Sequence, residues 1–375
     1  MRPAVVYGLL HAGLALSRAL GRTGVPVYGL ALDRRDFGLR SRYLTGRRVV
    51  AADEDVLAAL RELRERPVLF PERDVNVAFV LRNWDAVHEL AEVPLPDDPD
   101  VVRRLRRKER LPEEAAAAGV AAPATVAATN ADAVRRAGLR APFLVKPAEG
   151  QEFALAFGEK AVVAADTDAA VATWQRAHEL GFDTIVQELI PDSHEHVFSL
   201  LTYIGRSGEP LAIVTGRKVR QGPLRFGTSA VFETVGIPDV EEHGLRLLRH
   251  VGYRGFAHVE FARDPRDDEL KLLEVNTRLP VWAGIAMGRE LNLARIAYDD
   301  LCGESVEPAR RLADGISWVY LAKDMWVSAQ MARRRELGPR AFLAHYVRPN
   351  KVRAVFAADD PMPALASLAY LRSRV

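Results

Sequence analysis

The pattern of apolar residues changes once along the chain, and this change limits the folds that the chain can adopt. In the first part, the run AVVYGL (residues 4–9) predicts a buried strand, and a helix is expected over about residues 12–22. Another strand, VLFP (68–71), precedes an amphipathic helix predicted over residues 75–91. Strands that alternate with helices predict a small doubly wound parallel sheet, an α/β arrangement.

From about residue 141 the strands instead follow one another as hairpins. Residues 197–221 are predicted to form one hairpin and residues 256–276 a second one, with a helix expected over residues 240–252. This second part is therefore expected to be an α+β segment built on antiparallel sheet. The residues from about 303 onward carry helices and the predicted strand VRAVFAADD.

Composition and charge exclude several classes of protein. The apolar fraction is 49%, and 52 basic residues nearly balance 50 acidic ones, so no nucleic-acid partner is expected. The basic run RRLRRKER (103–110) is better explained as the polar face of a helix that buries Leu105. The apolar N-terminus is interrupted by Arg18 and is too short to span a bilayer, so we expect no membrane segment and a cytoplasmic location. The single cysteine, Cys302, excludes a disulfide framework within the chain.

Polar side chains interrupt the apolar strand LKLLEVNTRLP (270–280) at every second position. Glu274, Asn276 and Arg278 are predicted to share one face, because alternate residues of a strand point the same way. Glu260 lies in the partner strand of the same predicted hairpin. Carboxylate and amide oxygens are the ligands that Mg²⁺ prefers, so Glu260, Glu274 and Asn276 are candidate metal ligands. Alternatively, the two glutamates form a solvent-facing pair balanced by Lys271 and Arg263.

Lysine is rare in this chain, at only seven of the 52 basic residues. Lys146 ends the strand FLVKP, Lys218 and Arg220 alternate on GRKVRQ, and Lys108 is predicted to lie on a helix. Positive charges of this kind neutralise a triphosphate and polarise its terminal phosphoryl group. The extended stretch VQELI (186–190) is suited to offering main-chain groups to an adenine edge, and Glu195 to accepting hydrogen bonds from ribose hydroxyls.

This order of motifs resembles the ATP-grasp superfamily. The matching features are Lys108 followed by AGVAAP, the strand FLVKP, the hinge VQELI, TGRKVRQ, and the strand pair HVEF and LLEVNTR. The segments GRKVRQGPLRFGTSAVFETV and VFAADDPMPAL are similar to the carboxylate–amine ligase branch, which includes D-aspartate ligase-like enzymes. The resemblance covers about residues 4–300 and, more loosely, the tail.

The resemblance implies a two-lobed ATP-grasp fold after the parallel domain. The expected parts are an N-terminal domain over 1–96, a first lobe with linker helices over 97–186, a second lobe with the metal and substrate site over 187–302, and a C-terminal extension over 303–375.

The resemblance also implies the cofactors, ATP with one or two Mg²⁺ or Mn²⁺ ions, and a role for each site residue. Lys108 and Lys146 are expected to contact the ATP phosphates. The adenine is expected to face Gln187, Glu188, Leu189 and Ile190, and the ribose to meet Glu195. Glu260, Glu274 and Asn276 are expected to hold the metal. The γ-phosphate and the acyl phosphate are expected to be steadied by Arg278, Lys218 and Arg220.

The predicted function is an ATP-dependent carboxylate–amine ligase that forms an amide through an acyl phosphate. Its partners are expected to be a small-molecule carboxylate and an amine, and the protein is expected to be a homodimer. The loop GPLRFGTSA (222–230) is predicted to close over the reacting centre, because exclusion of water protects an acyl phosphate. The alternative is a non-catalytic ATP-binding sensor or partner subunit. An NAD-linked oxidoreductase is disfavoured because the first domain lacks G-x-G-x-x-G.

Overall fold

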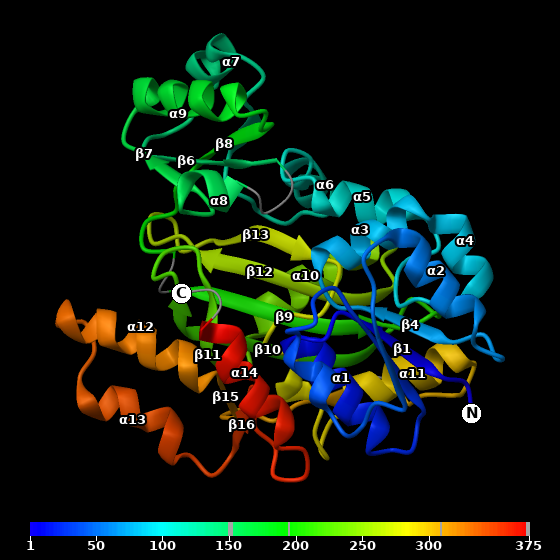
Figure 1. Ribbon diagram of the computed structural model, residues 1–375. Coiled ribbons are helices and arrows are strands. Elements are labelled where there is room, and N and C mark those ends of the chain that lie inside the picture. The colour runs from blue at the N-terminus through cyan, green and yellow to red at the C-terminus, as the bar shows by residue number, and fades with distance from the viewer. Residues whose placement is uncertain (149–152, 194–195, 308–309, 373–375) are drawn as a thin grey trace.

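The computed structural model describes residues 1–148, 153–193, 196–307 and 310–372, which form three sheets and the helices around them (Figure 1). Among these residues, no helix combines the length and the apolar character that crossing a membrane requires.

The N-terminal sheet is parallel, as the sequence predicts. Its four strands lie in the order β3 (Gly46–Val49), β2 (Val27–Ala31), β1 (Ala4–Tyr7) and β4 (Val68–Pro71). Successive apolar residues of β1 point into two different cores, one on each side of the sheet, so the sheet buries both of its faces. The accompanying helices are α1 (His11–Gly21), η1 (Phe37–Arg40), α2 (Asp53–Arg61), α3 (Asp74–Arg82) and α4 (Trp84–Leu90).

The predicted helix over 75–91 is wrong in one respect, because it is two helices that meet at Asn83. This residue has φ −116° and ψ 37°, and its side chain donates to the carbonyl of Phe79 and to Asp53. An asparagine that bonds to nearby backbone competes with the helical hydrogen bonds, which accounts for the break.

The second sheet, which we call the small lobe, is antiparallel. Its strands lie in the order β5 (Thr125–Ala127), β8 (Thr184–Glu188), β6 (Phe143–Pro147) and β7 (Val162–Ala164). Helices α7 (Ala131–Arg136) and α9 (Thr167–Glu179) pack against it, while α8 (Phe153–Phe157) follows β6. The predicted division between residues 186 and 187 falls inside β8, which pairs with β5 and β6 along its whole length.

The large sheet supplies the centre of the molecule. Its strands lie in the order β13 (Leu270–Asn276), β12 (Gly255–Arg263), β9 (Val197–Ile204), β10 (Pro210–Gly222), β11 (Thr228–Thr234), β15 (Ser317–Val319) and β16 (Lys351–Arg353), with β14 (Arg310–Arg311) beside β10. The two predicted hairpins are β9–β10 and β12–β13. The predicted loop over 222–230 is shorter than expected, because Thr228 already begins β11.

Both faces of the large sheet are covered. One face packs against α5 (Pro99–Arg106), α6 (Leu111–Ala117) and α10 (Pro238–His250). The other face packs against α1, η2 (Ala283–Ala286) and α11 (Leu293–Cys302), so the core continues into the N-terminal sheet.

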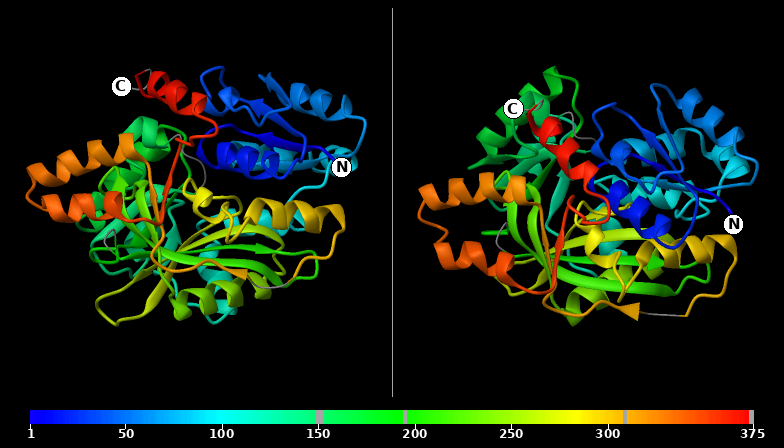
Figure 2. Two further views of the ribbon diagram at one scale, coloured as in Figure 1. Left: turned by 90° about the horizontal axis from the view of Figure 1, so that it is seen from below. Right: turned by 60° about the horizontal axis from the view of Figure 1, so that its bottom comes forward.

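The C-terminal segment adds strands to the large sheet. Strand β15 pairs with β11 and β16 pairs with β15, so the predicted strand VRAVFAADD forms a strand only over Lys351–Arg353. Helices α12 (Leu321–Arg333) and α13 (Pro339–Val347) pack beside the large sheet, and α14 (Met362–Arg372) returns to η1 of the N-terminal domain (Figure 2). The buried Arg18 side chain fixes this return by donating to Asp360 at 2.9 Å.

Candidate active site

The hairpin β12–β13 brings the predicted metal ligands together. Glu260 lies opposite Glu274, and His258 lies opposite Asn276. Side chains that face each other across antiparallel strands share one face of the sheet, so the expected clustering of oxygen donors is present. Glu260 is buried, with 7% of its surface exposed.

Two carboxylates this close need positive charge or hydrogen bonds to remain ionised. Lys218 Nζ lies 2.8 Å from Glu260 Oε1, and the Asn276 amide donates to Glu274 at 2.6 Å. Burial alone would raise the pKa of Glu274, but Asn276 and the charges of Lys108, Lys218 and Lys160 lower it to about 2. The Glu274 carboxylate is therefore ionised at neutral pH, and the solvent-facing alternative does not describe this hairpin.

These donors fit a hard cation. In the part of the chain that the structure describes, no group of three or more His, Cys, Asp or Glu side chains is placed to bind a metal. The set of Glu260, Glu274 and Asn276 consists instead of two carboxylates and an amide. Mg²⁺ bound to a nucleotide takes one or two carboxylates together with waters and phosphate oxygens, so a set of this size suits it.

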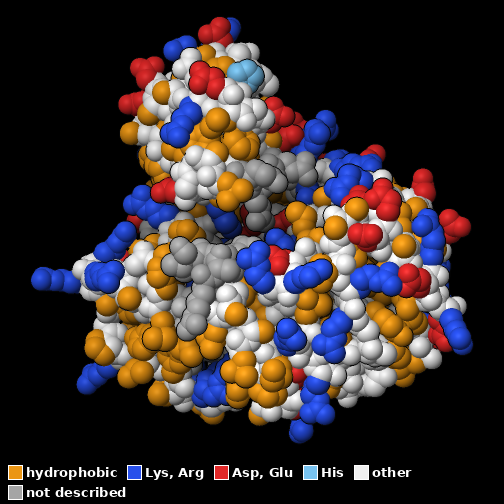
Figure 3. Space-filling view, in the orientation of Figure 1, with side chains coloured by type: hydrophobic (Ala, Val, Ile, Leu, Met, Phe, Trp, Pro, Cys, Tyr) orange, Lys and Arg blue, Asp and Glu red, His pale blue; other side chains and the backbone are white. Residues whose placement is uncertain are grey.

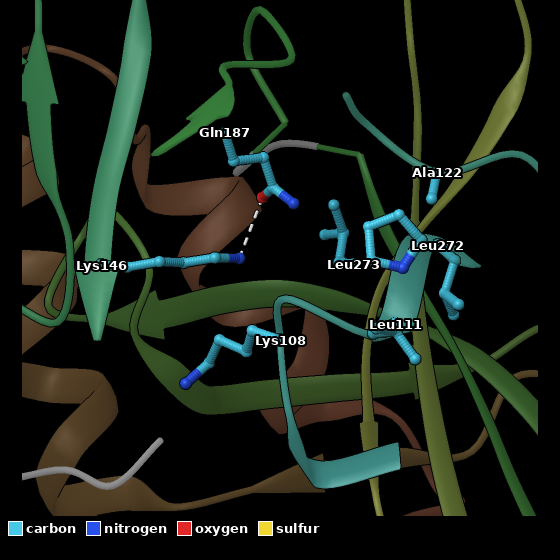
Figure 4. Close-up of a pocket in the computed structure, with 8 residues that line it drawn as sticks. Lys108, Leu111, Ala122, Lys146, Gln187, Leu272 and Leu273 are labelled. Atoms are coloured by element: carbon cyan, nitrogen blue, oxygen red, sulfur yellow. Dashed lines mark hydrogen bonds between the residues drawn. The ribbon is translucent and has the colours of Figure 1, made fainter. Parts of the chain in front are cut away.

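The predicted phosphate lysines meet in a hollow between the small lobe and the large sheet (Figure 4). The hollow is also lined by Gln187 and Leu273. Lys146 reaches it from the end of β6 and donates to Gln187 Oε1 at 2.9 Å, while Lys108 Nζ donates to the carbonyl of Pro147 at 3.0 Å. Figure 3 shows basic side chains around the same junction.

The two lysines of the hollow lie in different kinds of structure. Lys108 lies in the turn between α5 and α6, so its predicted helical position is wrong; α5 ends at Arg106, and α6 begins at Leu111. Lys146 is enclosed, and burial together with the charge of Lys108 lowers its pKa to about 8 against the opposing effect of Glu274. An ammonium so placed gains stability from an anionic ligand.

The predicted adenine segment enters the site only in part. Gln187 faces the hollow, donates to Thr125 Oγ1 and accepts from Lys146. The Glu188 carboxylate turns away and accepts from the main-chain N–H of Arg140. The N–H groups of Glu188 and Leu189 already donate to carbonyls of the small lobe, and Ile190 is buried. Glu195, the predicted ribose ligand, lies outside the described residues.

Arg220 does not share a face with Lys218, and this prediction is wrong. Lys218 pairs with Phe232 while Arg220 pairs with Val231, so a bulge at Val219 turns the two side chains to opposite faces. Arg220 donates to Asp324 of α12 at 2.6 and 2.9 Å, and both side chains are almost completely buried. Arg220 therefore anchors the C-terminal segment instead of pointing at a phosphate.

Arg278 lies at the edge of the site in a bidentate pair with Asp74. Its Nε and Nη2 atoms donate to the two carboxylate oxygens at 2.9 and 2.6 Å. Asp74 begins α3, with two residues between it and the end of strand β4, so the pair joins the N-terminal domain to the β12–β13 hairpin. The guanidinium is oriented by this contact, with 17% of its side chain exposed.

Two further lysines approach the site although no role was assigned to them from the sequence. The charge of Lys160 acts on Glu274, and the charges of Lys160 and Lys218 act on Lys323 of α12. The rarity of lysine was the available signal: five of the seven lysines gather here, and only Lys271 and Lys351 lie elsewhere. Their positions in the sequence gave no sign that they meet.

Comparison with known proteins agrees with this arrangement. Residues 217–289 match the family described as the carbamoyl-phosphate synthase L chain, ATP binding domain. The solved structure of an N5-carboxyaminoimidazole ribonucleotide synthetase in complex with ADP superposes with a TM-score of 0.68 at 15% identity, over 89% of this chain and 86% of that one. Residues 217–289 are thus similar to an ATP-binding domain, and the superposition shows that this chain has the fold of that synthetase.

Two further enzymes are similar to this chain. The D-aspartate ligase of Enterococcus faecium (strain Aus0004) is 29% identical over 133 residues, which is 33% of this chain and 31% of that enzyme. The match thus spans about a third of the length of this curated relative. The biotin carboxylase domain of Hydrogenobacter thermophilus 2-oxoglutarate carboxylase, solved with MgADP, ADP and bicarbonate, has a TM-score of 0.65 at 14% identity, over 83% of this chain and 72% of that one. Likeness to solved structures at this level of identity shows the fold.

Proposed function

We propose that this protein is a member of the ATP-grasp superfamily and acts as an ATP-dependent ligase that joins a carboxylate to an amine. The observation that carries the proposal is one juxtaposition. The hairpin that carries Glu260, Asn276 and the ionised Glu274 lies beside Lys218 and next to a hollow that Lys108 and Lys146 line. Oxygen donors on one side and ammonium groups on the other suit a magnesium nucleotide.

The proposed reaction has two steps. A carboxylate oxygen of the first substrate attacks the γ-phosphorus of ATP, the bond to ADP breaks, and an acyl phosphate forms. The amine nitrogen then attacks the acyl carbon, phosphate leaves, and the nitrogen loses a proton to give the amide. The protein needs no covalent nucleophile for this sequence, because positioning and charge stabilisation supply the catalysis.

Each role falls to side chains of this chain. Lys108 and Lys146 would neutralise the phosphates, and Glu260, Glu274 and Asn276 would hold one or two Mg²⁺ ions. Lys218 and Arg278 would stabilise the charge that develops on the transferred phosphoryl group. Arg220 has no part in this scheme because it is enclosed by Asp324. The D-aspartate ligase relative makes D-aspartate the first carboxylate to test.

The first test replaces Glu274 by Gln, which keeps the shape of the side chain and removes its charge. We expect phosphate release from Mg-ATP with a pool of amino acids to fall by about 10²–10³-fold, the usual cost of one strong electrostatic contact at a reacting centre. Glu269→Gln is the matched control, since Glu269 is an exposed residue of the same hairpin. Unchanged turnover in Glu274→Gln would remove the metal assignment.

A screen for products separates the ligase from the non-catalytic alternative. Wild-type protein is incubated with Mg-ATP and pairs of amino acids, and the amide is sought by mass spectrometry. A new amide together with phosphate release supports the ligase. If ATP raises the melting temperature but no pair gives phosphate or amide, the protein is an ATP-binding sensor or partner subunit.

A further inference from the structure

Lys323 is a lysine in an unusual setting. It is the third residue of α12, and its ammonium donates to the carbonyl of Thr228 at 2.9 Å and to the Thr228 hydroxyl. Both partners are neutral, and no Asp or Glu among the described residues forms an ion pair with Lys323. A partly buried ammonium without a carboxylate is costly, so its position calls for a ligand.

The surroundings of Lys323 are positive. Burial and the charges of Lys160 and Lys218 lower the pKa of its ammonium to about 7. On another side lies His11 of the N-terminal domain, whose ring packs 4.4 Å from that of Tyr320. Burial and the charge of Lys323 lower the pKa of His11 to about 3, so this imidazole is neutral and supplies no balancing charge or repulsion.

Two neighbouring residues, Asp324 and Gly222, fix the position of Lys323. The next residue, Asp324, is fully buried in its pair with Arg220 and accepts from the Tyr346 hydroxyl at 2.6 Å. Gly222, at the end of β10, leaves the space through which Lys323 passes, because a Cβ there would lie 3.0 Å from Lys323 Cε and 2.7 Å from Val327 Cγ2. The Lys323 side chain is thus held beside Gly222 and against Thr228.

Lys323 is separate from the ATP hollow. The charges of Lys108 and Glu274 act on Lys146, whereas those of Lys160 and Lys218 act on Lys323. Lys323 is not among the residues that line the ATP hollow, and the charge of Lys218 acts on both Glu274 and Lys323. Resting on the proposed ligase function, we propose that Lys323 and Thr228 form the subsite that binds the carboxylate of the substrate other than ATP.

The rarity of lysine makes a direct test practical. Reductive methylation with ¹³C-formaldehyde labels only seven lysines and the N-terminal amine, and Lys323→Arg identifies the Lys323 signal. We expect acetate and succinate, titrated in separate samples, to shift this signal saturably. The Lys351 signal is the internal control, because Lys351 donates to the carbonyl of Arg348 at the far edge of the same sheet.

Two outcomes of this titration would overturn the proposal. One is a Lys323 signal that neither carboxylate moves. The other is a signal that inorganic phosphate moves while the carboxylates do not, which would assign Lys323 to the nucleotide phosphates. Because binding is measured without turnover, either result leaves the ligase proposal to be judged by its own product screen.

Kinetics provide the second arm once an amide product is known. A charge-assisted hydrogen bond contributes about 1.5–3 kcal/mol, so Lys323→Met should raise the KM for the carboxylate substrate by about 10- to 100-fold. The KM for ATP should stay within about twofold, Lys323→Arg should recover part of the loss, and Lys351→Met should match the wild type. A rise in the KM for ATP alone would contradict the assignment.

Discussion

Strand β10 presents two charged regions on its opposite faces, and their chemistry differs. On one face, Lys218 lies 2.8 Å from Glu260 beside the candidate site, and Lys323 donates to the carbonyl and hydroxyl oxygens of Thr228. On the other face, Arg220 forms a closed bidentate pair with Asp324, which also accepts from Tyr346. Among the described residues, the Lys323 ammonium thus forms no ion pair with a carboxylate, whereas the Arg220 guanidinium is paired with Asp324.

The difference follows from the two kinds of cation. Guanidinium presents a planar fork that matches one carboxylate, so arginine suits a permanent internal pair such as Arg220–Asp324 or Arg18–Asp360. Ammonium is a compact charge on a flexible stem, and its pKa shifts readily on burial. In this chain a buried arginine such as Arg220 forms a permanent internal pair, whereas five of the seven lysines lie around the candidate site.

The largest expected effect comes from removing the buried Arg220–Asp324 pair. Arg220→Met leaves Asp324 buried and without its cation, so the free energy of unfolding should fall by about 3–5 kcal/mol. Chemical denaturation measures this loss. Arg217→Met is the control on the same strand; the Arg217 side chain is 56% exposed, and its loss should cost no more than about 1 kcal/mol. Equal losses in the two variants would mean that the Arg220 pair does not anchor α12.

The second effect is a loss of turnover when Lys218, on the opposite face of β10, is replaced. Lys218→Met should reduce the turnover of Mg-ATP by about 10²–10³-fold, because one cation at the transferred phosphoryl group is lost. Its free energy of unfolding should fall less than that of Arg220→Met, since repulsion from the neighbouring lysines is relieved at the same time. Steady-state kinetics and denaturation on both variants make the comparison. Turnover within twofold of the wild type would exclude Lys218 from the reacting centre.

The smallest effect is a dependence of ATP affinity on pH. The pKa of Lys146 is about 8, so its ammonium is present below that pH and is lost as the pH rises through it. The affinity for ATP should be level up to about pH 8 and then weaken towards tenfold per unit. Calorimetric titration at several pH values measures this. Lys146→Arg should flatten the profile, because a guanidinium keeps its charge; the same break in that variant would assign it to another group.

Much of the site was predictable from local sequence. Glu260, Glu274 and Asn276 lie in the two strands of one short hairpin, and the period of two in each strand fixes the face that they share. The position of Lys146, near the end of a strand and before Pro147, could also be predicted from local sequence. These predictions needed only neighbouring residues and the geometry of one element.

Predictions that crossed an irregularity failed. Lys218 and Arg220 share a face in a regular strand, but the bulge at Val219 separates them, and nothing in GRKVRQ announces that bulge. Lys108 left its predicted helix because the chain turns at residues 107–110. The early end of the loop after Gly222 depends likewise on the pairing of β11 with β10 and β15.

The sequence by itself determined the parallel first sheet, the two hairpins and the carboxylate face, because each follows from periodicity within a few dozen residues. The tertiary structure alone decided which cations reach that face. Lys160, Lys218 and Lys323 come from separate elements, and Asp74 orients Arg278 across 204 residues of sequence. These contacts depend on packing between distant elements, which no local pattern specifies. The same packing places Arg220 against Asp324, where it anchors α12 and does not face the site.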